Sequence, residues 1–164
     1  MADRPASNMN TLRLISFAMC AGMLLFAALT IFLTVEGSSP GAKSQGTSSS
    51  VGMILLAATG AIGISAAVAW QAIRMALEGS AREAWRKPGE VEEKERNLWS
   101  RYSSLVITRH ALTESFGFLG IVSLLIGGQW WGLAAPAIAF GLILNGLPSQ
   151  AKYHQFLSRA TAER

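Results

Sequence analysis

The sequence predicts an all-α integral membrane protein, an antiparallel bundle of four transmembrane helices that forms a single domain over residues 1–164. Three observations support this fold class. The chain is 51% hydrophobic and only 15% charged, whereas charged residues make up about 25% of a soluble protein. The apolar residues are gathered into four long runs, and the basic residues lie almost entirely on one side of those runs.

The four apolar runs have the length of membrane-spanning helices. They cover approximately residues 14–35, 51–73, 105–126 and 130–147. A hydrocarbon core about 30 Å thick needs roughly 20 apolar residues in a helix. The first run is longer than the roughly 7–15 apolar residues of a signal peptide, and no A-x-A-like cleavage site follows it. We therefore expect all four runs to remain as membrane helices.

The basic residues predict the orientation of the bundle. Twelve of the fourteen Lys and Arg lie in the two terminal tails and in the segment 74–104, and the first loop contains only Lys43. Basic residues accumulate on the cytoplasmic side of a membrane. Both termini are therefore expected in the cytoplasm, as in an inner-membrane protein of bacteria. The net charge of +4 then indicates contact with anionic lipids, and no nucleic-acid motif is visible.

The segment 74–104 is predicted to form a cytoplasmic helical hairpin. It carries seven basic and six acidic residues, and "KPG" at 87–89 interrupts it. Proline and glycine end helices, so a helical extension of the second run should precede the break and a helix leading into the third run should follow it. Such mixed charge is typical of a solvated hairpin. A docking surface for a cytoplasmic partner is the alternative.

Tryptophans mark the expected membrane boundaries. Trp is enriched at this depth because its ring is apolar while its N–H needs a polar partner. We interpret Trp70 and Trp99 as anchors at the inner interface, and Trp130 and Trp131 as anchors at the outer one.

Small residues in the second and third runs predict close helix packing, because they let two helix backbones approach each other. We expect the second run to be the partner of the third. The residues are Ala57, Gly60, Ala61, Gly63 and Ser65 in the second run, and Gly117 and Gly120 in the third.

The stretch "ITRHALTESFGFLG" (107–120) places Arg109, His110 and Glu114 in an otherwise apolar run. If the hydrocarbon begins at Leu105, Glu114 lies about 13–14 Å inside, close to the mid-plane. If it begins at Ala111, Glu114 is one turn deep, and the two basic side chains lie at the headgroups. Arg side chains can reach the interface from a few residues inside, so hydropathy does not decide between these depths.

A carboxyl group at mid-depth is costly and is therefore commonly functional. A neutral Glu114 could exchange a proton, with His110 as a relay. An ionised Glu114 could instead pair with His110 or Arg109 and fix the packing of the helices. A shallow, solvated Glu114 is the third alternative.

The second and third runs resemble the c subunit of rotary ATP synthases. "ALEGSAREA" (76–84) is similar to that family's E-G-x-A-R segment at the entry to the cytoplasmic loop. Glu114 stands where the family has its ion-carrying carboxylate, and "GIV" (120–122) follows at the family's spacing. The resemblance implies transport of a proton or an ion by Glu114 within an oligomer. The chain as a whole resembles small, uncharacterised four-helix membrane proteins of bacteria.

No nucleophile–base set, metal cluster or phosphate-binding loop is visible, so we expect no enzyme activity, no cofactor and no metal site. The only cysteine, Cys20, is expected to be a packing residue. The predicted function is that of a structural or accessory membrane protein, with Arg109, His110 and Glu114 fixing the helices or a partner. The alternative is a proton- or ion-handling protein. Beyond the lipid bilayer, the partner is either a second copy of the chain or another membrane protein.

Overall fold

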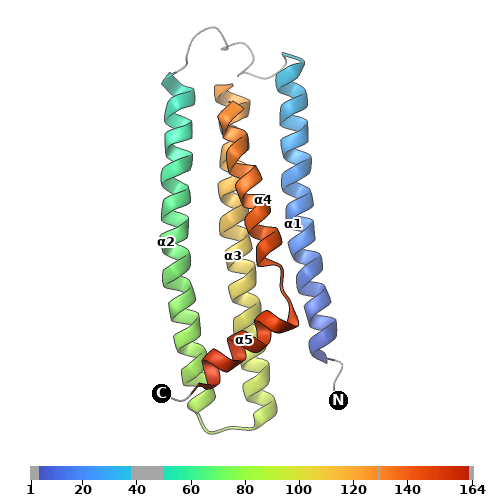
Figure 1. Ribbon diagram of the computed structural model, residues 1–164, viewed down its shortest axis with the longest axis vertical. Helices are drawn as coiled ribbons and strands as arrows, with labels where there is room; N and C mark the ends of the chain where they lie inside the picture. The colour runs from blue at the N-terminus through green and yellow to red at the C-terminus, as the bar shows by residue number, and fades with distance from the viewer. Residues whose placement is uncertain (1–3, 38–49, 129, 163–164) are drawn as a thin grey trace.

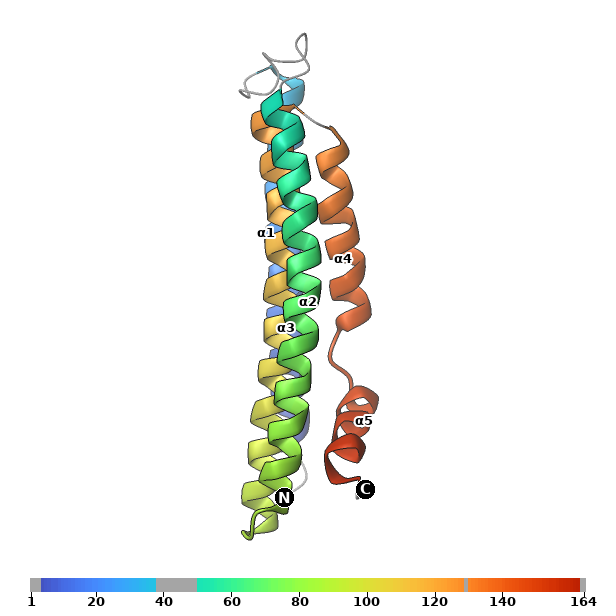
Figure 2. The ribbon, with the colours of Figure 1, turned by 90° about the vertical axis from the view of Figure 1, so that its left-hand side faces the viewer.

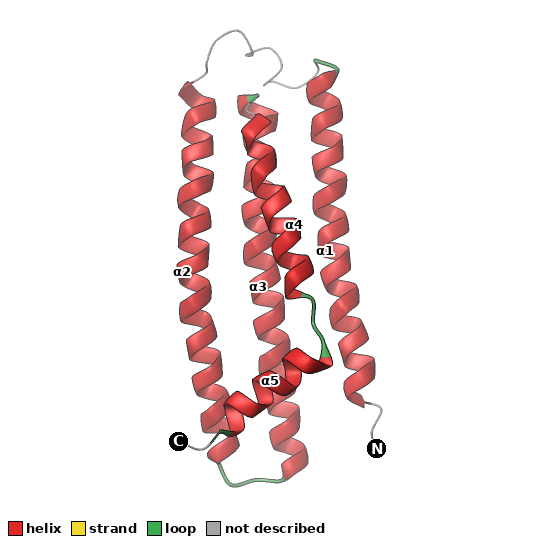
Figure 3. Ribbon diagram, viewed as in Figure 1, coloured by secondary structure: helices red, strands yellow, loops and turns green. Residues whose placement is uncertain are grey.

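The computed structural model describes residues 4–37, 50–128 and 130–162, and these residues are helical almost throughout (Figures 1 and 3). The described ranges contain no strand, which confirms the predicted all-α class. Lys43 and most of the loop that contains it lie outside these ranges. The elements are α1 (Arg4–Val35), α2 (Ser50–Arg86), α3 (Val91–Gly127), a short 3-10 helix η2 (Trp130–Leu133), α4 (Ala134–Gly146) and α5 (Gln150–Thr161).

Helix α3 is the central element of the bundle. It packs against α1, α2 and α4. The helices α1, α3 and α2 form one layer with α3 in the middle, and α4 lies on one face of that layer (Figures 1 and 2). At the foot of α4 the chain turns, and α5 crosses the layer towards α2.

Three helices are long and apolar enough to cross a membrane: Met9–Val35, Gly52–Arg86 and Val91–Gly127. Their large apolar side chains are widely exposed; Leu25 is 73% exposed and Ile64 is 70% exposed. Apolar surface of this extent is unfavourable in water and favourable in hydrocarbon. The helices therefore indicate a membrane protein.

The predicted fourth span, residues 130–147, differs from the other three. It consists of η2 followed by α4, which has only 13 residues and ends at Gly146. After Pro148 the chain continues as α5 at an angle of 73°. A fourth span is present only if such a bent pair is counted as one, so four membrane crossings stay a prediction.

The predicted break at "KPG" is confirmed. Helix α2 continues to Arg86 and α3 begins at Val91, so the hairpin has two helical arms that extend the second and third runs. Glu92 and Glu93 lie in the first turn of α3, where negative charge is favourable beside the positive end of the helix dipole.

Helix α5 is missing from the sequence-based prediction because it is short and polar. Two local signals mark it. The side chain of Ser149 accepts a hydrogen bond from the backbone N–H of Lys152 and so caps the first turn. Phe156 and Ala160, four residues apart on one helix face, are both buried.

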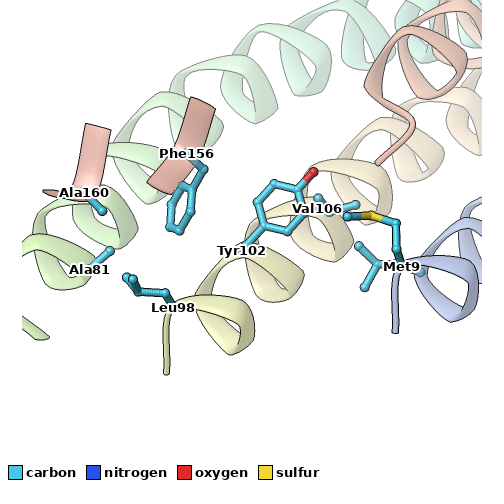
Figure 4. Close-up of a cluster of buried hydrophobic side chains, with 8 residues drawn as sticks. Met9, Ala81, Leu98, Tyr102, Val106, Phe156 and Ala160 are labelled. Atoms are coloured by element: carbon cyan, nitrogen blue, oxygen red, sulfur yellow. The ribbon is translucent and has the colours of Figure 1, made fainter. Parts of the chain in front are cut away.

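Two hydrophobic clusters hold the helices together. The lower one fastens α5 to the ends of α1, α2 and α3 (Figure 4). The upper one joins α1, α3 and α4, and it contains the buried Cys20, as expected for a packing residue. The lower cluster consists of Met9, Leu12, Ala81, Leu98, Tyr102, Val106, Phe156 and Ala160.

Gly117 and Gly120 allow α4 to approach α3 closely. A Cβ atom at Gly120 would meet the carbonyl oxygen of Gly132 and would lie 2.5 Å from the Cβ of Ala135. A Cβ atom at Gly117 would lie 3.0 Å from the Cβ of Ala139. These neighbours on η2 and α4 are backbone or Cβ atoms that cannot move aside. We call the surface of α3 at Gly117 and Gly120 the glycine notch, and α4 packs into it. The glycine notch does not face the second run, which was its expected partner.

The small residues of α2 are placed differently. Gly63 faces α3, because a Cβ atom there would lie 2.7 Å from Cε2 of Phe116. Ala57, Gly60, Ala61 and Ser65 are exposed. Close packing by these four residues stays a prediction.

Candidate functional site at the bend between α4 and α5

The end of α4 creates a need for hydrogen-bond donors. The last carbonyl groups of an α-helix have no partner within the helix. Helix α4 ends at Gly146, and Leu147 is extended, with φ −49° and ψ 133°. Pro148 has no N–H group and cannot continue the helix. The carbonyl group of Leu144 accepts from the backbone N–H of Leu147 at 3.3 Å, and the other carbonyl groups near Gly146 are open to donors from elsewhere.

Two basic side chains from different helices donate to carbonyl groups around this end of α4. The guanidinium group of Arg109, on α3, donates to the carbonyl oxygen of Leu142 at 3.4 Å. The ammonium group of Lys152, on α5, donates to the carbonyl oxygens of Asn145 at 2.5 Å and Leu147 at 3.0 Å. Positive charge is favourable at this end of α4, because the helix dipole places negative partial charge there.

A third basic side chain reaches the bend from α1. Nε of Arg13 donates to the carbonyl oxygen of Pro148 at 3.1 Å. The bend is therefore held by one cation from each of α1, α3 and α5. We call Arg13, Arg109 and Lys152 the bend cations.

His110 is buried beside the bend, with 1% of its surface exposed. Its Nδ1 lies 2.9 Å from Oγ of Ser16 on α1. This hydroxyl also donates to the carbonyl oxygen of Leu12, 3.0 Å away. A hydroxyl has a single proton, so a Ser16 that donates to Leu12 accepts from an Nδ1–H group. The pair is a polar contact between α1 and α3 within an apolar interface.

Gly146 is the residue of α4 that lies against Arg109 and His110 of α3. A Cβ atom at Gly146 would lie 2.9 Å from Nε2 of His110 and 3.1 Å from Cζ of Arg109. Nε2 of His110 is buried and lies against the backbone of Gly146. The absence of a side chain at residue 146 allows α4 to end directly against α3.

Glu114 does not take part in this arrangement. It is half-buried on the side of α3 that faces α1, near Cys20. Among residues 4–37, 50–128 and 130–162, it forms no hydrogen bond and no salt bridge. The three predicted site residues therefore separate: Arg109 and His110 lie at the bend, and Glu114 stands apart from them.

A groove of about 930 Å³ lies between α2 and α4, with α3 as its floor. Most of its lining is apolar and includes Ile64, Phe116 and Ile138. Towards α5, the lining contains Arg109 of the predicted site together with charged residues that the sequence analysis does not single out as a site. These are Arg74, Glu78, Lys152 and Arg159.

The charged end of the groove is held together by one carboxylate. Nε of Arg74 lies 2.9 Å from Oε1 of Glu78, and a guanidinium nitrogen of Arg159 lies 3.7 Å from the same oxygen. The pair on α2 has the i,i+4 spacing typical of helical ion pairs, which is the sequence signal for it. Nothing in the sequence indicates that Arg159 of α5 would join that pair.

The four predicted anchors occupy different environments. Trp70 lines the groove. Trp99 packs against Tyr153, with ring centroids 5.1 Å apart. Trp130 and Trp131 are exposed at the opposite end of the bundle, Trp131 by 78%. Their role as membrane anchors stays a prediction.

Within the described residues, no group of three or more His, Cys, Asp or Glu side chains could hold a metal ion. Comparisons with protein-family models, with curated proteins and with solved structures find no match for the chain.

The contact between Ser16 and His110 can be tested by a double-mutant cycle. We expect Ser16→Ala to destabilise the protein by about 1–3 kcal/mol, because it leaves a buried ring nitrogen without a partner. In a His110→Leu background the same substitution should cost much less, with a coupling free energy of about 0.5–3 kcal/mol. Thermal unfolding in detergent measures both values.

Ser104→Ala is the control for this cycle. Ser104 is exposed, and its hydroxyl donates only to the carbonyl oxygen of Ser100 in its own helix. We expect this change to stay within about 0.5 kcal/mol of the wild type. Strictly additive effects of Ser16→Ala and His110→Leu would show that the two side chains do not interact.

Proposed function

We propose that the chain is a structural or accessory protein of the bacterial inner membrane, in which Arg13 and Arg109 fasten a fourth, bent helical segment to α1 and α3, while His110 joins α3 to α1 beside the bend. The observation that carries this proposal is the donation of hydrogen bonds by the three bend cations, from three different helices, to the carbonyl groups around the end of α4. Such an arrangement stabilises one geometry of the bundle and involves no reacting group.

The length of η2 and α4 supports a fourth crossing. Four residues at about 2.0 Å and thirteen at about 1.5 Å give about 28 Å, close to the roughly 30 Å of a hydrocarbon core. In this placement α5 lies along the membrane surface, as interfacial helices do. Phe156 and Ala160 pack against the other helices, while its polar residues face outwards.

The distribution of charge supports an orientation with this surface in the cytoplasm. The start of α1 and the end of α5 lie at the same end of the bundle as the hairpin between α2 and α3 (Figure 1). This end carries most of the basic residues, as the positive-inside rule requires of a cytoplasmic side. Arg109 then lies at the inner interface, and Glu114 lies about 7–8 Å deeper, which favours the shallower of the two depths for the third span.

Single-cysteine labelling tests this placement. In a Cys20→Ser background, we expect a cysteine at Glu36 to react with a membrane-impermeant maleimide on intact cells. A cysteine at Ser158 should react only after the membrane is permeabilised. Both positions are exposed, so a lack of reaction reports protection by the membrane. Labelling of the Ser158 position from outside would refute the proposed orientation.

A second candidate function is supported by the isolation of Glu114. We propose, as the alternative, that Glu114 takes up and releases a proton or another cation, as its resemblance to the ion-carrying carboxylate of c subunits implies. A half-buried carboxyl group without an ion-pair partner supports this alternative over a structural lock, since an ion pair would hold the charge in place. The exposed small-residue face of α2 would then be available for contact with a second copy.

Proton flux into liposomes tests the alternative. If Glu114 carries protons, the reconstituted wild type should acidify the lumen faster than protein-free liposomes, and Glu114→Gln should reduce that flux at least tenfold. Glu36→Gln is the matched control, because Glu36 is exposed at the end of α1. Equal flux with and without the wild-type protein, in this assay and in the same assay run with a sodium gradient, would remove this candidate function and leave the structural one.

A further inference from the structure

The groove between α2 and α4 has two chemically different ends. Its upper part is lined by apolar side chains, several of which are open to the surroundings: Ile64 is 70% exposed and Ile138 is 54% exposed. Along α2 the lining extends from Gly60 to Arg74, a distance of about 21 Å. This distance exceeds the roughly 15 Å of hydrocarbon in one leaflet of a bilayer, so the groove is long enough for an extended acyl chain.

The lower end of the groove is strongly basic. Four cations, Arg74, Arg109, Lys152 and Arg159, line it together with the single carboxylate of Glu78, which leaves a net charge of +3. Arg109 lies close enough to Arg74 and to Lys152 for their charges to repel one another.

Cations gathered at one end of a groove repel one another, and an anion that binds among them relieves this repulsion. The protein groups already in contact with these cations do not supply enough negative charge. Glu78 is shared between Arg74 and Arg159, while Arg109 and Lys152 donate to uncharged carbonyl groups. Arg109 makes a single such bond, although a guanidinium group has five N–H donors. Donors therefore remain at this end for an anionic group.

We propose that this groove binds one anionic glycerophospholipid of the inner leaflet, with its phosphate at the four cations and an acyl chain along the apolar part beside Ile64 and Ile138. Basic pockets between membrane helices on the cytoplasmic side bind the headgroups of anionic lipids in this way. The bound lipid fills the space between α2 and α4 and neutralises the charge beside the bend. A zwitterionic lipid fits less well, because its own cation would lie among the four of the protein.

The inference rests on the proposed placement of α5 at the cytoplasmic surface, which cysteine labelling tests separately. If a cysteine at Ser158 reacts from outside the cell, the proposed placement of α5 is wrong. If the labelling is as expected but the lipid experiment below shows no preference for the anionic lipid, only the proposed lipid site is wrong.

Native mass spectrometry of the full chain provides the test. The purified protein in detergent is titrated with phosphatidylglycerol and, in a parallel series, with phosphatidylcholine. We expect one phosphatidylglycerol to be retained per chain, with at least tenfold preference over phosphatidylcholine. Removing two cations by Arg74→Gln and Arg159→Gln should weaken retention about 25-fold, at about fivefold for each cation. Arg109 and Lys152 are left unchanged because they also hold the bend.

A second variant tests the apolar part of the groove without changing any charge. Gly60→Leu places a side chain into the groove, where an added Cβ atom meets nothing within 4 Å, so the fold should tolerate it. We expect this variant to lose the retained lipid. Gly22→Leu on α1 is the matched control, since residue 22 is equally open and lies outside the groove. The control for the charge variant is Arg86→Gln with Arg96→Gln, two exposed residues of the hairpin.

Three results would overturn the proposal. The first is equal retention of the two lipids by the wild type. The second is wild-type retention by both the charge variant and Gly60→Leu. The third is competition by soluble glycerol 1-phosphate as strong as that by phosphatidylglycerol, which would indicate a site for a small phosphate compound without an acyl chain.

Discussion

The arrangement of this protein depends on hydrogen bonds to the carbonyl groups at the end of α4. The last carbonyl groups of a helix have no partner within the helix, and side chains that donate to them fix how the helix ends. The chain supplies Arg13, Arg109 and Lys152 as donors. This requirement explains why a guanidinium group lies inside an apolar run of α3: it faces the free end of a neighbouring helix. It also connects α1, α3 and α5 at a single point.

The packing around α3 is consistent with this constraint. Gly117 and Gly120 bring α4 close to α3, and Gly146 lets the end of α4 meet His110 and Arg109 directly. Along the other side of α3, the polar contact between His110 and Ser16 sets the position of α1. The outer faces of α1 and α2 make few such contacts and expose apolar side chains. Specific polar contacts between α1, α3 and the bent segment therefore lie near the bend, while the apolar outer faces of α1 and α2 suit lipid.

Much of the fold could be predicted from the sequence, because long apolar runs and a "KPG" break are local signals. The end of the fourth run near residue 147 was also predicted, and α4 ends at Gly146. Helix α5 was missed because it is short and polar, although Ser149 marks its start. The partner of the glycines on α3 and the side chains that contact the bend could not be predicted, because they depend on residues that are distant in the chain. Arg109 contacts a residue 33 positions away and His110 contacts one 94 positions away. Their closeness to Glu114 in the sequence suggested a single group of three, but these distant contacts separate Glu114 from the other two.

The most direct test of the role of the bend cations is a distance measurement across the bend. Spin labels at Ser100 on α3 and Ser158 on α5, both exposed, in a Cys20→Ser background report how firmly α5 is held. Pulsed electron paramagnetic resonance should give one narrow distance distribution in the otherwise unchanged protein and in Arg86→Gln with Arg96→Gln. Arg109→Gln with Lys152→Gln should broaden it markedly, because the carbonyl groups of Leu142, Asn145 and Leu147 lose their donors. An equally narrow distribution in that variant would show that the hydrophobic cluster alone positions α5 and that the bend cations are not what holds the bundle in this geometry.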